Sequence, residues 1–131
     1  MSAEARGADS EACLEMLATC CEAKRLERAR TLAAKVGFQV ADAELVIAAV
    51  ANYNVVLDIK ARRIQHGCRD FQGQAAERRL CKHVAAAILA LDADACRTIA
   101  TELAEGVAAA AAGEVAPWSF EVITRFTPGR G

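Results

Sequence analysis

Apolar residues recur along this 131-residue chain with two different spacings. From Ser10 to about Arg30 they recur every three or four residues, with Leu14, Leu17 and Cys21 on one face. This spacing is typical of an amphipathic α-helix, for which Ser10 is a suitable N-cap. Further along the chain the spacing changes to two, which is typical of β-strands. The pattern therefore predicts an N-terminal helix followed by a sheet.

Three short segments alternate between apolar and other residues and are rich in β-branched side chains. They are residues 36–40, 45–50 and 53–59. Their lengths and short connections predict antiparallel strands. The third leads into residues 63–68, which we also expect to be extended, and a loop is expected over residues 69–80.

Two helices are expected after this loop. The first covers residues 82–91. The second starts at Asp92 or Asp94 and ends either at Gly106 or, through an alanine run, at Gly113. These elements together predict an α+β fold with an N-terminal helix, a small antiparallel sheet and C-terminal helices.

The last apolar segment, residues 116–126, leaves two interpretations open. Its alternation favours a strand, although Pro117 could equally start a helix. Trp118 and Phe120 in this segment are candidates for a contact with another protein, because large apolar side chains are enriched at interfaces.

Composition limits where the protein is expected to work. Six cysteines would suggest a disulfide framework in a secreted protein. However, residues 1–9 are polar and acidic, unlike a signal peptide, and no apolar run is long enough to cross a membrane. We therefore expect an intracellular, cytoplasmic protein that can associate with a nucleoid or nucleus. Cys13, Cys20 and Cys21 are then core or surface thiols of the first helix, or form a disulfide of the kind found inside thermophiles.

Two pairs of metal-ligand residues stand out in the middle of the chain. They are His66-x-Cys68 and Cys81-x-His83, with twelve residues between the pairs, and they use both histidines of the sequence. Two thiolates and two imidazoles are donors that suit a tetrahedral Zn²⁺ site. The sequence therefore predicts one zinc ion held by all four side chains.

The two pairs need different backbones to share one metal. An extended segment places residues i and i+2 on the same face, so His66 and Cys68 can converge at the end of a strand. On a continuous helix, residues i and i+2 lie about 200° apart. Cys81 and His83 can therefore share a metal only if the helix begins at Cys81. A helix N-terminus also favours a thiolate.

With Asp70 and Phe71, and with the apolar helix that follows Cys-Lys-His, this arrangement resembles the SWIM zinc finger, whose pattern is C-x-C, a loop and C-x-H. Residues 66–91 carry the resemblance, and residues 36–59 are similar to the strands that precede the motif in that family. His66 stands where the family usually has its first cysteine. This change keeps a zinc ligand but makes the site formally neutral instead of −1.

The resemblance implies how the chain is organised around the motif. We expect one compact domain in which residues 36–91 form a zinc-clamped ββα unit. Residues 1–35 precede it as a helical segment, and residues 92–131 follow it as a helix and tail.

Basic side chains gather around the motif. Residues 60–82 carry seven basic and two acidic side chains, a balance of +5, whereas the rest of the chain carries nine basic and fifteen acidic ones, a balance of −6. A local basic surface can contact phosphates or an acidic protein surface, although it can also be a solvated charged loop. The expected contact residues, called the basic rim below, are Arg62, Arg63, Arg69, Arg78, Arg79 and Lys82.

The resemblance implies a binding module. SWIM domains occur in partners of recombinase paralogues in Shu-type complexes, in Swi/Snf-type ATPase-associated proteins and in transposases. A small stand-alone chain is most similar to the recombination-accessory type. We therefore expect an accessory protein of DNA repair and recombination that contacts a protein partner, a recombinase paralogue, with direct DNA binding as the alternative.

An enzyme is disfavoured on chemical grounds. Four protein ligands leave no position for a water on zinc, and a metal-bound cysteine is a poor free nucleophile. No third histidine is available for another catalytic set. We therefore predict no catalytic residues, no small-molecule substrate and no membrane partner.

Overall fold

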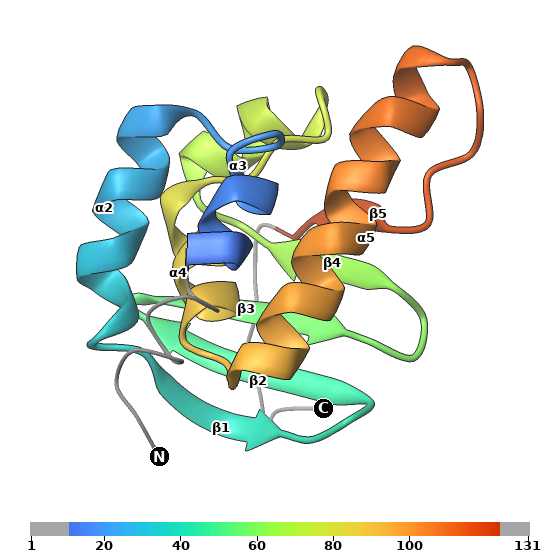
Figure 1. The fold of residues 1–131 in the computed structure, drawn as a ribbon. Helices are drawn as coiled ribbons and strands as arrows, with labels where there is room; N and C mark the ends of the chain where they lie inside the picture. Colours follow the sequence, from blue (N-terminus) through green and yellow to red (C-terminus); the bar gives the residue numbers. More distant parts are fainter. Residues whose placement is uncertain (1–10, 124–131) are drawn as a thin grey trace.

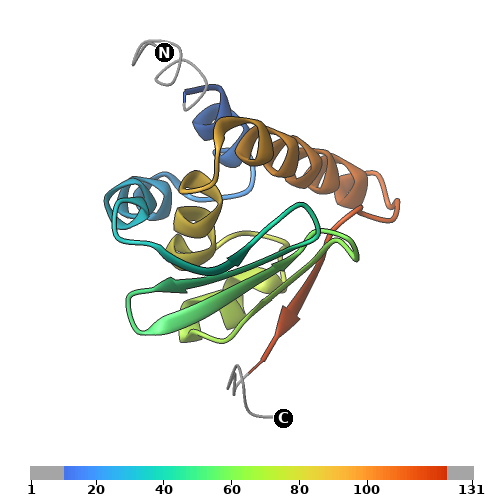
Figure 2. The ribbon, with the colours of Figure 1, turned by 90° about the horizontal axis from the view of Figure 1, so that it is seen from below.

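The computed structural model describes residues 11–123 of the chain, and these residues form the expected α+β architecture (Figure 1). One sheet has the strand order β1-β2-β3-β4-β5. Seen from below, α2, α4 and α5 lie together on one face of the sheet (Figure 2). The strands are β1 (Gly37–Ala41), β2 (Leu45–Val50), β3 (Tyr53–Asp58), β4 (Arg63–His66) and β5 (Ser119–Val122). The helices are a segment at residues 11–17 and α2 (Ala23–Ala33), α3 (Arg69–Ala75), α4 (Lys82–Leu89) and α5 (Ala93–Ala111).

The first four strands pair antiparallel in chain order, as their spacing predicts. In β2 the alternate residues Val46, Ala48 and Val50 are buried, whereas the residues between them are only partly covered. Their period of two therefore places one face of the sheet against the helices. This face forms the core together with the apolar face of α4, of which Val84 and Ile88 are fully buried.

The single N-terminal helix predicted to about Arg30 is wrong. Helical residues end at 17, a turn covers residues 18–22, and α2 starts at Ala23. The turn carries Cys20 and Cys21 into the core, and the Cys20 carbonyl accepts a hydrogen bond from the Leu80 amide at 2.8 Å. This long-range bond removes the Cys20 carbonyl from helical pairing. The predicted N-cap, Ser10, lies outside the described residues.

The loop predicted over residues 69–80 contains a helix, α3, so the extended segment before it ends early. β4 stops at His66, and Cys68 is the N-cap of α3.

Both helices predicted after this segment are present. The first is α4, which ends two residues before the expected Leu91, and the second is α5. Asp92 is its N-cap, and its side chain accepts a hydrogen bond from the Ala95 amide at 3.0 Å. α5 continues through the alanine run, and Gly113 follows it with a φ of 76°.

The strand alternative for the last segment is confirmed by β5, which pairs parallel with β4. The expectation that Trp118 contacts another protein is wrong, because its side chain is only 2% exposed. Its indole Nε1 donates a hydrogen bond to Glu102 Oε1 at 2.7 Å. Phe120 is partly covered and its ring stacks on that of Phe71. Residues 124–126 of the predicted strand lie outside the described residues.

A disulfide joins Cys13, in the helical segment at 11–17, to Cys96 near the start of α5. Cys13 is therefore not the free thiol that the sequence favoured, and the disulfide alternative holds for this residue. The other four cysteines are free and buried. No helix among residues 11–123 is long and apolar enough to span a bilayer.

Candidate metal centre

Each of the four predicted ligands sits at the end of a secondary-structure element. His66 is the last residue of β4, and Cys68 is the N-cap of α3. Cys81 is the N-cap of α4 with extended backbone angles, φ −84° and ψ 172°, and His83 lies in the first turn of that helix. The backbone change at Cys81 allows two residues with one residue between them to face the same point. The sequence argument for a helix that begins at this cysteine is therefore confirmed.

The structure brings the four side chains together. One candidate ligand atom from each of His66, Cys68, Cys81 and His83 lies within 4.8 Å of all the others. A tetrahedral ion with Zn–S bonds of about 2.3 Å and Zn–N bonds of about 2.0 Å separates its ligand atoms by roughly 3.3–3.8 Å. The 4.8 Å limit of the cluster is thus about 1 to 1.5 Å wider than the spacing that a tetrahedral metal needs. All four residues are buried, so the cluster could hold a metal ion away from bulk solvent.

Hydrogen bonding leaves one nitrogen of each imidazole without a partner. His66 Nδ1 lies 2.7 Å from the carbonyl oxygen of Asn54, a distance that suits donation from Nδ1–H. His66 Nε2 and His83 Nδ1 are both buried and have no hydrogen-bond partner. A buried polar atom without a partner is costly, and a metal ion at the cluster would satisfy both. The Asn54 carbonyl also selects the tautomer whose Nε2 lone pair is free for a metal.

The two sulfur atoms form a coupled pair. The side chain of Cys81 hydrogen-bonds to Cys68 and lowers the pKa of the Cys68 thiol far below its ordinary value. The Cys68 sulfur also accepts a hydrogen bond from the Phe71 amide at 3.3 Å. Burial raises the pKa of Cys81, and its interaction with Cys68 raises it further. Without a cation, therefore, the pair retains one proton, and a cation at the cluster would favour release of that proton.

Aromatic rings enclose the imidazoles. The ring of Tyr53 lies 4.8 Å from that of His83 and 5.7 Å from that of His66, measured between centroids. The ring of Phe71 makes an edge-to-face contact with that of His66, with a centroid distance of 5.4 Å. Tyr53 is 44% exposed, so its ring contacts solvent as well as the two buried imidazoles. The sequence pattern did not identify Tyr53 or Asn54, because their contacts with the ligands depend on the β3–β4 pairing.

An ion pair connects the segment that carries the candidate ligands to α2. The Arg25 guanidinium donates to both carboxylate oxygens of Asp70, at 2.8 and 2.6 Å. This bidentate contact raises the pKa of Arg25. Asp70 is in the first turn of α3, two residues after Cys68. The role of Arg25 could not be predicted from spacing, because 45 residues separate it from Asp70.

The structure divides the predicted basic rim into two groups. Arg62 is paired with Glu102 at 2.9 Å and Arg63 with Asp58 at 3.4 Å. Arg78 donates to the Trp118 carbonyl at 3.3 Å. The side chains of the other three, Arg69, Arg79 and Lys82, have no carboxylate or hydrogen-bond partner among residues 11–123. The rim residues available to an external partner are thus the three in the second group.

The remaining free thiols do not belong to the cluster. Burial raises the pKa of Cys20 to about 11 and that of Cys21 to about 12, so both thiols stay protonated near neutral pH. Across the described part of the chain, they belong to no group of three or more His, Cys, Asp or Glu residues able to hold a metal. They are core residues.

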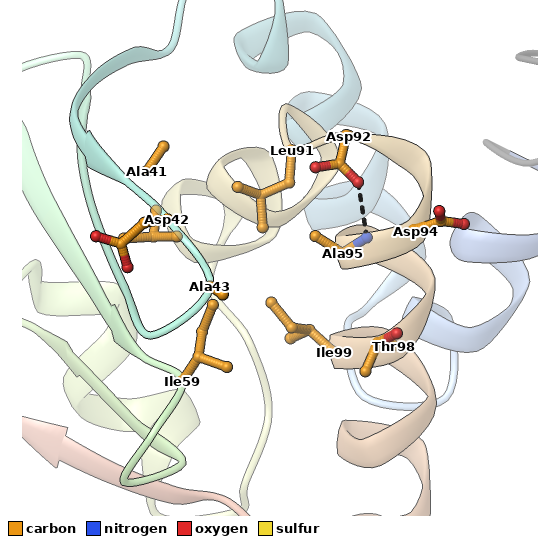
Figure 3. Close-up of a pocket in the computed structure, with 11 residues that line it drawn as sticks. Ala41, Asp42, Ala43, Ile59, Leu91, Asp92, Asp94, Ala95, Thr98 and Ile99 are labelled. Atoms are coloured by element: carbon orange, nitrogen blue, oxygen red, sulfur yellow. Dashed lines mark hydrogen bonds between the residues drawn. The ribbon is translucent and has the colours of Figure 1, made fainter.

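A separate cavity of about 480 Å³ lies between the turn after β1 and the N-terminal turns of α5 (Figure 3). Its apolar lining includes Ile59, Leu91 and Ile99. The carboxylates of Asp42 and Asp94 lie on opposite sides of it and do not converge. Asp42 instead accepts hydrogen bonds from the amides of its own turn, and Asp94 pairs with Arg97 at 2.8 Å. The cavity contains none of the cluster residues.

Comparison with protein-family models, with curated proteins and with solved structures found no match for this chain. The functional argument therefore rests on the site itself.

Proposed function

We propose that His66, Cys68, Cys81 and His83 bind one Zn²⁺ ion. The single observation that carries this proposal is the buried His₂Cys₂ cluster, whose candidate ligand atoms lie within 4.8 Å of one another and whose two histidines each have a buried nitrogen without a hydrogen-bond partner. Thiolate and imidazole donors in a four-ligand set suit zinc better than the oxygen-seeking Mg²⁺ or Ca²⁺. Bound zinc would supply a positive charge that stabilises both thiolates.

The role of this zinc is structural. Four protein ligands fill a tetrahedral shell and leave no position for a substrate or a water. The ligands come from the end of β4 and the starts of α3 and α4, so the metal ties these three ends together. Structural zinc sites of this kind contribute directly to folding. Metal binding thereby fixes the surface on which Arg69, Arg79 and Lys82 lie.

The molecule with this zinc bound acts as a SWIM-type interaction module. The motif resemblance supports an accessory role in DNA repair and recombination, through contact with a protein such as a recombinase paralogue. The charge distribution favours a protein over DNA, because the chain outside residues 60–82 has a balance of −6. That charge would repel a long phosphate backbone wherever it lies within about 10 Å of the contact.

Metal analysis tests the zinc proposal directly. We expect protein purified without chelator to contain one equivalent of zinc and to lose it when Cys68 and Cys81 are both replaced by alanine. Cys21→Ala is the matched control, because it removes a buried thiol outside the cluster and should leave the zinc content unchanged. Less than about half an equivalent in the wild-type protein would contradict a four-ligand site.

The interaction role is tested with the same proteins. Zinc-loaded wild-type chain, tagged and mixed with a purified recombinase paralogue, should retain that partner, whereas the double cysteine variant should not. Retention of DNA in place of the protein would instead support the direct DNA-binding alternative. Equal retention of the partner by both proteins would mean that the metal centre is irrelevant to the interaction.

A further inference from the structure

A basic cavity lies beside the His₂Cys₂ cluster. A cavity of about 330 Å³ opens between the first turns of α2 and the start of α4, which lie side by side in both views of the fold (Figures 1 and 2). Four of its six lining residues are basic. They are Lys24, Arg25 and Arg28 of α2 and Lys82 of α4, and the two acidic members are Glu22 and Asp70.

The two carboxylates of this cavity are paired with the same side chain. One N–H group of Arg25 donates a hydrogen bond to Glu22, and two others donate to Asp70. Lys24, Arg28 and Lys82 have no carboxylate within ion-pair distance among the described residues. Glu27 lines the neighbouring hollow with Lys24 and Arg28, but it pairs with neither of them. The cavity therefore has a net charge of +2, from four basic and two acidic side chains, and three cations with no internal partner.

We infer that this cavity binds an acidic segment of a protein partner, in which two carboxylates contact Lys24, Arg28 and Lys82. Lys24 and Arg28 are four residues apart on α2, so their backbone positions are separated by about 6 Å along the helix axis. Carboxylates at alternate positions of an extended peptide are spaced by about 7 Å on one face. Two acidic side chains of one segment can thus meet both cations at once.

The lining of the cavity favours a peptide over nucleic acid. Proteins that bind single strands provide aromatic rings on which the bases stack. None of the six lining residues is aromatic. A short acidic segment also needs only the local positive charge, whereas a long phosphate backbone would extend over the acidic remainder of the chain.

Two lining residues of this cavity are close in sequence to the candidate zinc ligands. Lys82 stands between the ligands Cys81 and His83, and Asp70 follows Cys68 by two residues. The inference therefore rests on the proposed zinc-stabilised module and identifies the surface and the partner chemistry that the module uses. Lys24 and Arg28 extend the binding surface beyond the basic rim that the sequence suggested.

The test is a binding titration of the full, zinc-loaded chain with a labelled peptide in which Glu alternates with Ser, at low salt. Lys24→Glu combined with Arg28→Glu should raise the dissociation constant by at least about ten-fold, because two attractive contacts become repulsive. Arg30→Glu combined with Lys35→Glu is the matched control. It makes the same charge change at exposed residues of α2 and the turn after it, outside the cavity, and should change the constant by less than about two-fold.

Three results would overturn the inference. One is an equal loss of affinity in both double variants, since that would show only a general charge effect. Another is zinc-loaded wild-type protein that fails to bind the peptide at about 1 mM. The third is tighter, cavity-dependent binding of a single-stranded oligonucleotide of equal charge, which would assign the cavity to nucleic acid. Zinc content measured in the same samples keeps these results separate from a failure of the metal proposal.

Discussion

The sequence predicts His66 as a metal ligand, but it does not predict how the imidazole of His66 is oriented. The spacing His66-x-Cys68, matched by Cys81-x-His83, was enough to identify the four residues that the structure brings together. The sequence could not reveal how the imidazole is oriented. That depends on the Asn54 carbonyl, which lies 2.7 Å from Nδ1 and leaves Nε2 free. Every residue has a backbone carbonyl, so the sequence does not mark the one that accepts this hydrogen bond.

Substitution of His66 tests whether this imidazole is a ligand. We expect His66→Cys to retain zinc, because a thiolate restores the donor that SWIM motifs usually have at this position. His66→Ala should lower zinc affinity by more than about ten-fold, since three ligands and a water would remain. Competition with a chromogenic chelator would measure both affinities. Wild-type affinity in the alanine variant would mean that another donor completes the site.

At the scale of elements, the sequence predicts the features that depend on neighbouring residues, but it does not predict those that depend on distant contacts. The spacing of two in β2 and β3 and the Asp92 cap of α5 were predictable because each depends on neighbouring residues. The turn at residues 18–22 was missed because its carbonyl acceptor at Cys20 is used by Leu80, 60 residues later in the sequence. No glycine or proline marks that break in the chain.

The Cys13–Cys96 disulfide is the covalent connection between two elements, and it should stabilise the protein. It closes a loop with a sequence separation of 83 residues. Chain-entropy arguments give about 4.5 kcal/mol for a loop of this length, and measured values are usually smaller. We expect Cys13→Ser combined with Cys96→Ser to lower the free energy of unfolding by about 2–4 kcal/mol, measured by denaturant titration with zinc in excess.

A reductant provides the control for that measurement. A phosphine should lower the stability of the wild-type protein to that of the double serine variant and should leave the variant unchanged. The sample must be shown to contain free Cys13 and Cys96 thiols after treatment with the phosphine. If the free energy of unfolding of that wild-type sample is unchanged, the disulfide does not stabilise the protein.

At the scale of the whole molecule, two arginines of the predicted basic rim hold the C-terminal strand in place. Arg62 precedes β4 and pairs with Glu102 of α5, whose Oε1 also accepts a hydrogen bond from the Trp118 indole. Arg78, after α3, donates to the Trp118 carbonyl. This network explains why the parallel pairing of β5 with β4 escaped sequence reasoning. It depends on four segments that are adjacent only in the folded chain.

The same network predicts a pH-dependent part of the stability. The Arg62 hydrogen bond lowers the pKa of Glu102 below its ordinary value of 4.5. A group whose pKa is lower in the folded state stabilises the fold above its unfolded pKa, and this contribution is lost as the pH falls through the folded pKa. Glu102→Gln keeps an oxygen acceptor for Trp118 but removes the charge. The variant should therefore be less stable than the wild type at pH 7, and the difference should shrink below about pH 4.5 and disappear once Glu102 is protonated.

Denaturant titrations of both proteins from pH 7 down to about pH 3 would measure this difference. The proposed zinc site would lose its metal at low pH in both proteins alike, so that effect cancels in the comparison. Glu105→Gln is the matched control. Glu105 is exposed on the same helix and has no ion pair in the described part of the chain, so its replacement should produce no comparable trend. A Glu102→Gln deficit that stays constant over the whole pH range would show that the variant loses packing and not charge. In that case the charge on Glu102 would contribute nothing to the stability of the contacts that hold β5.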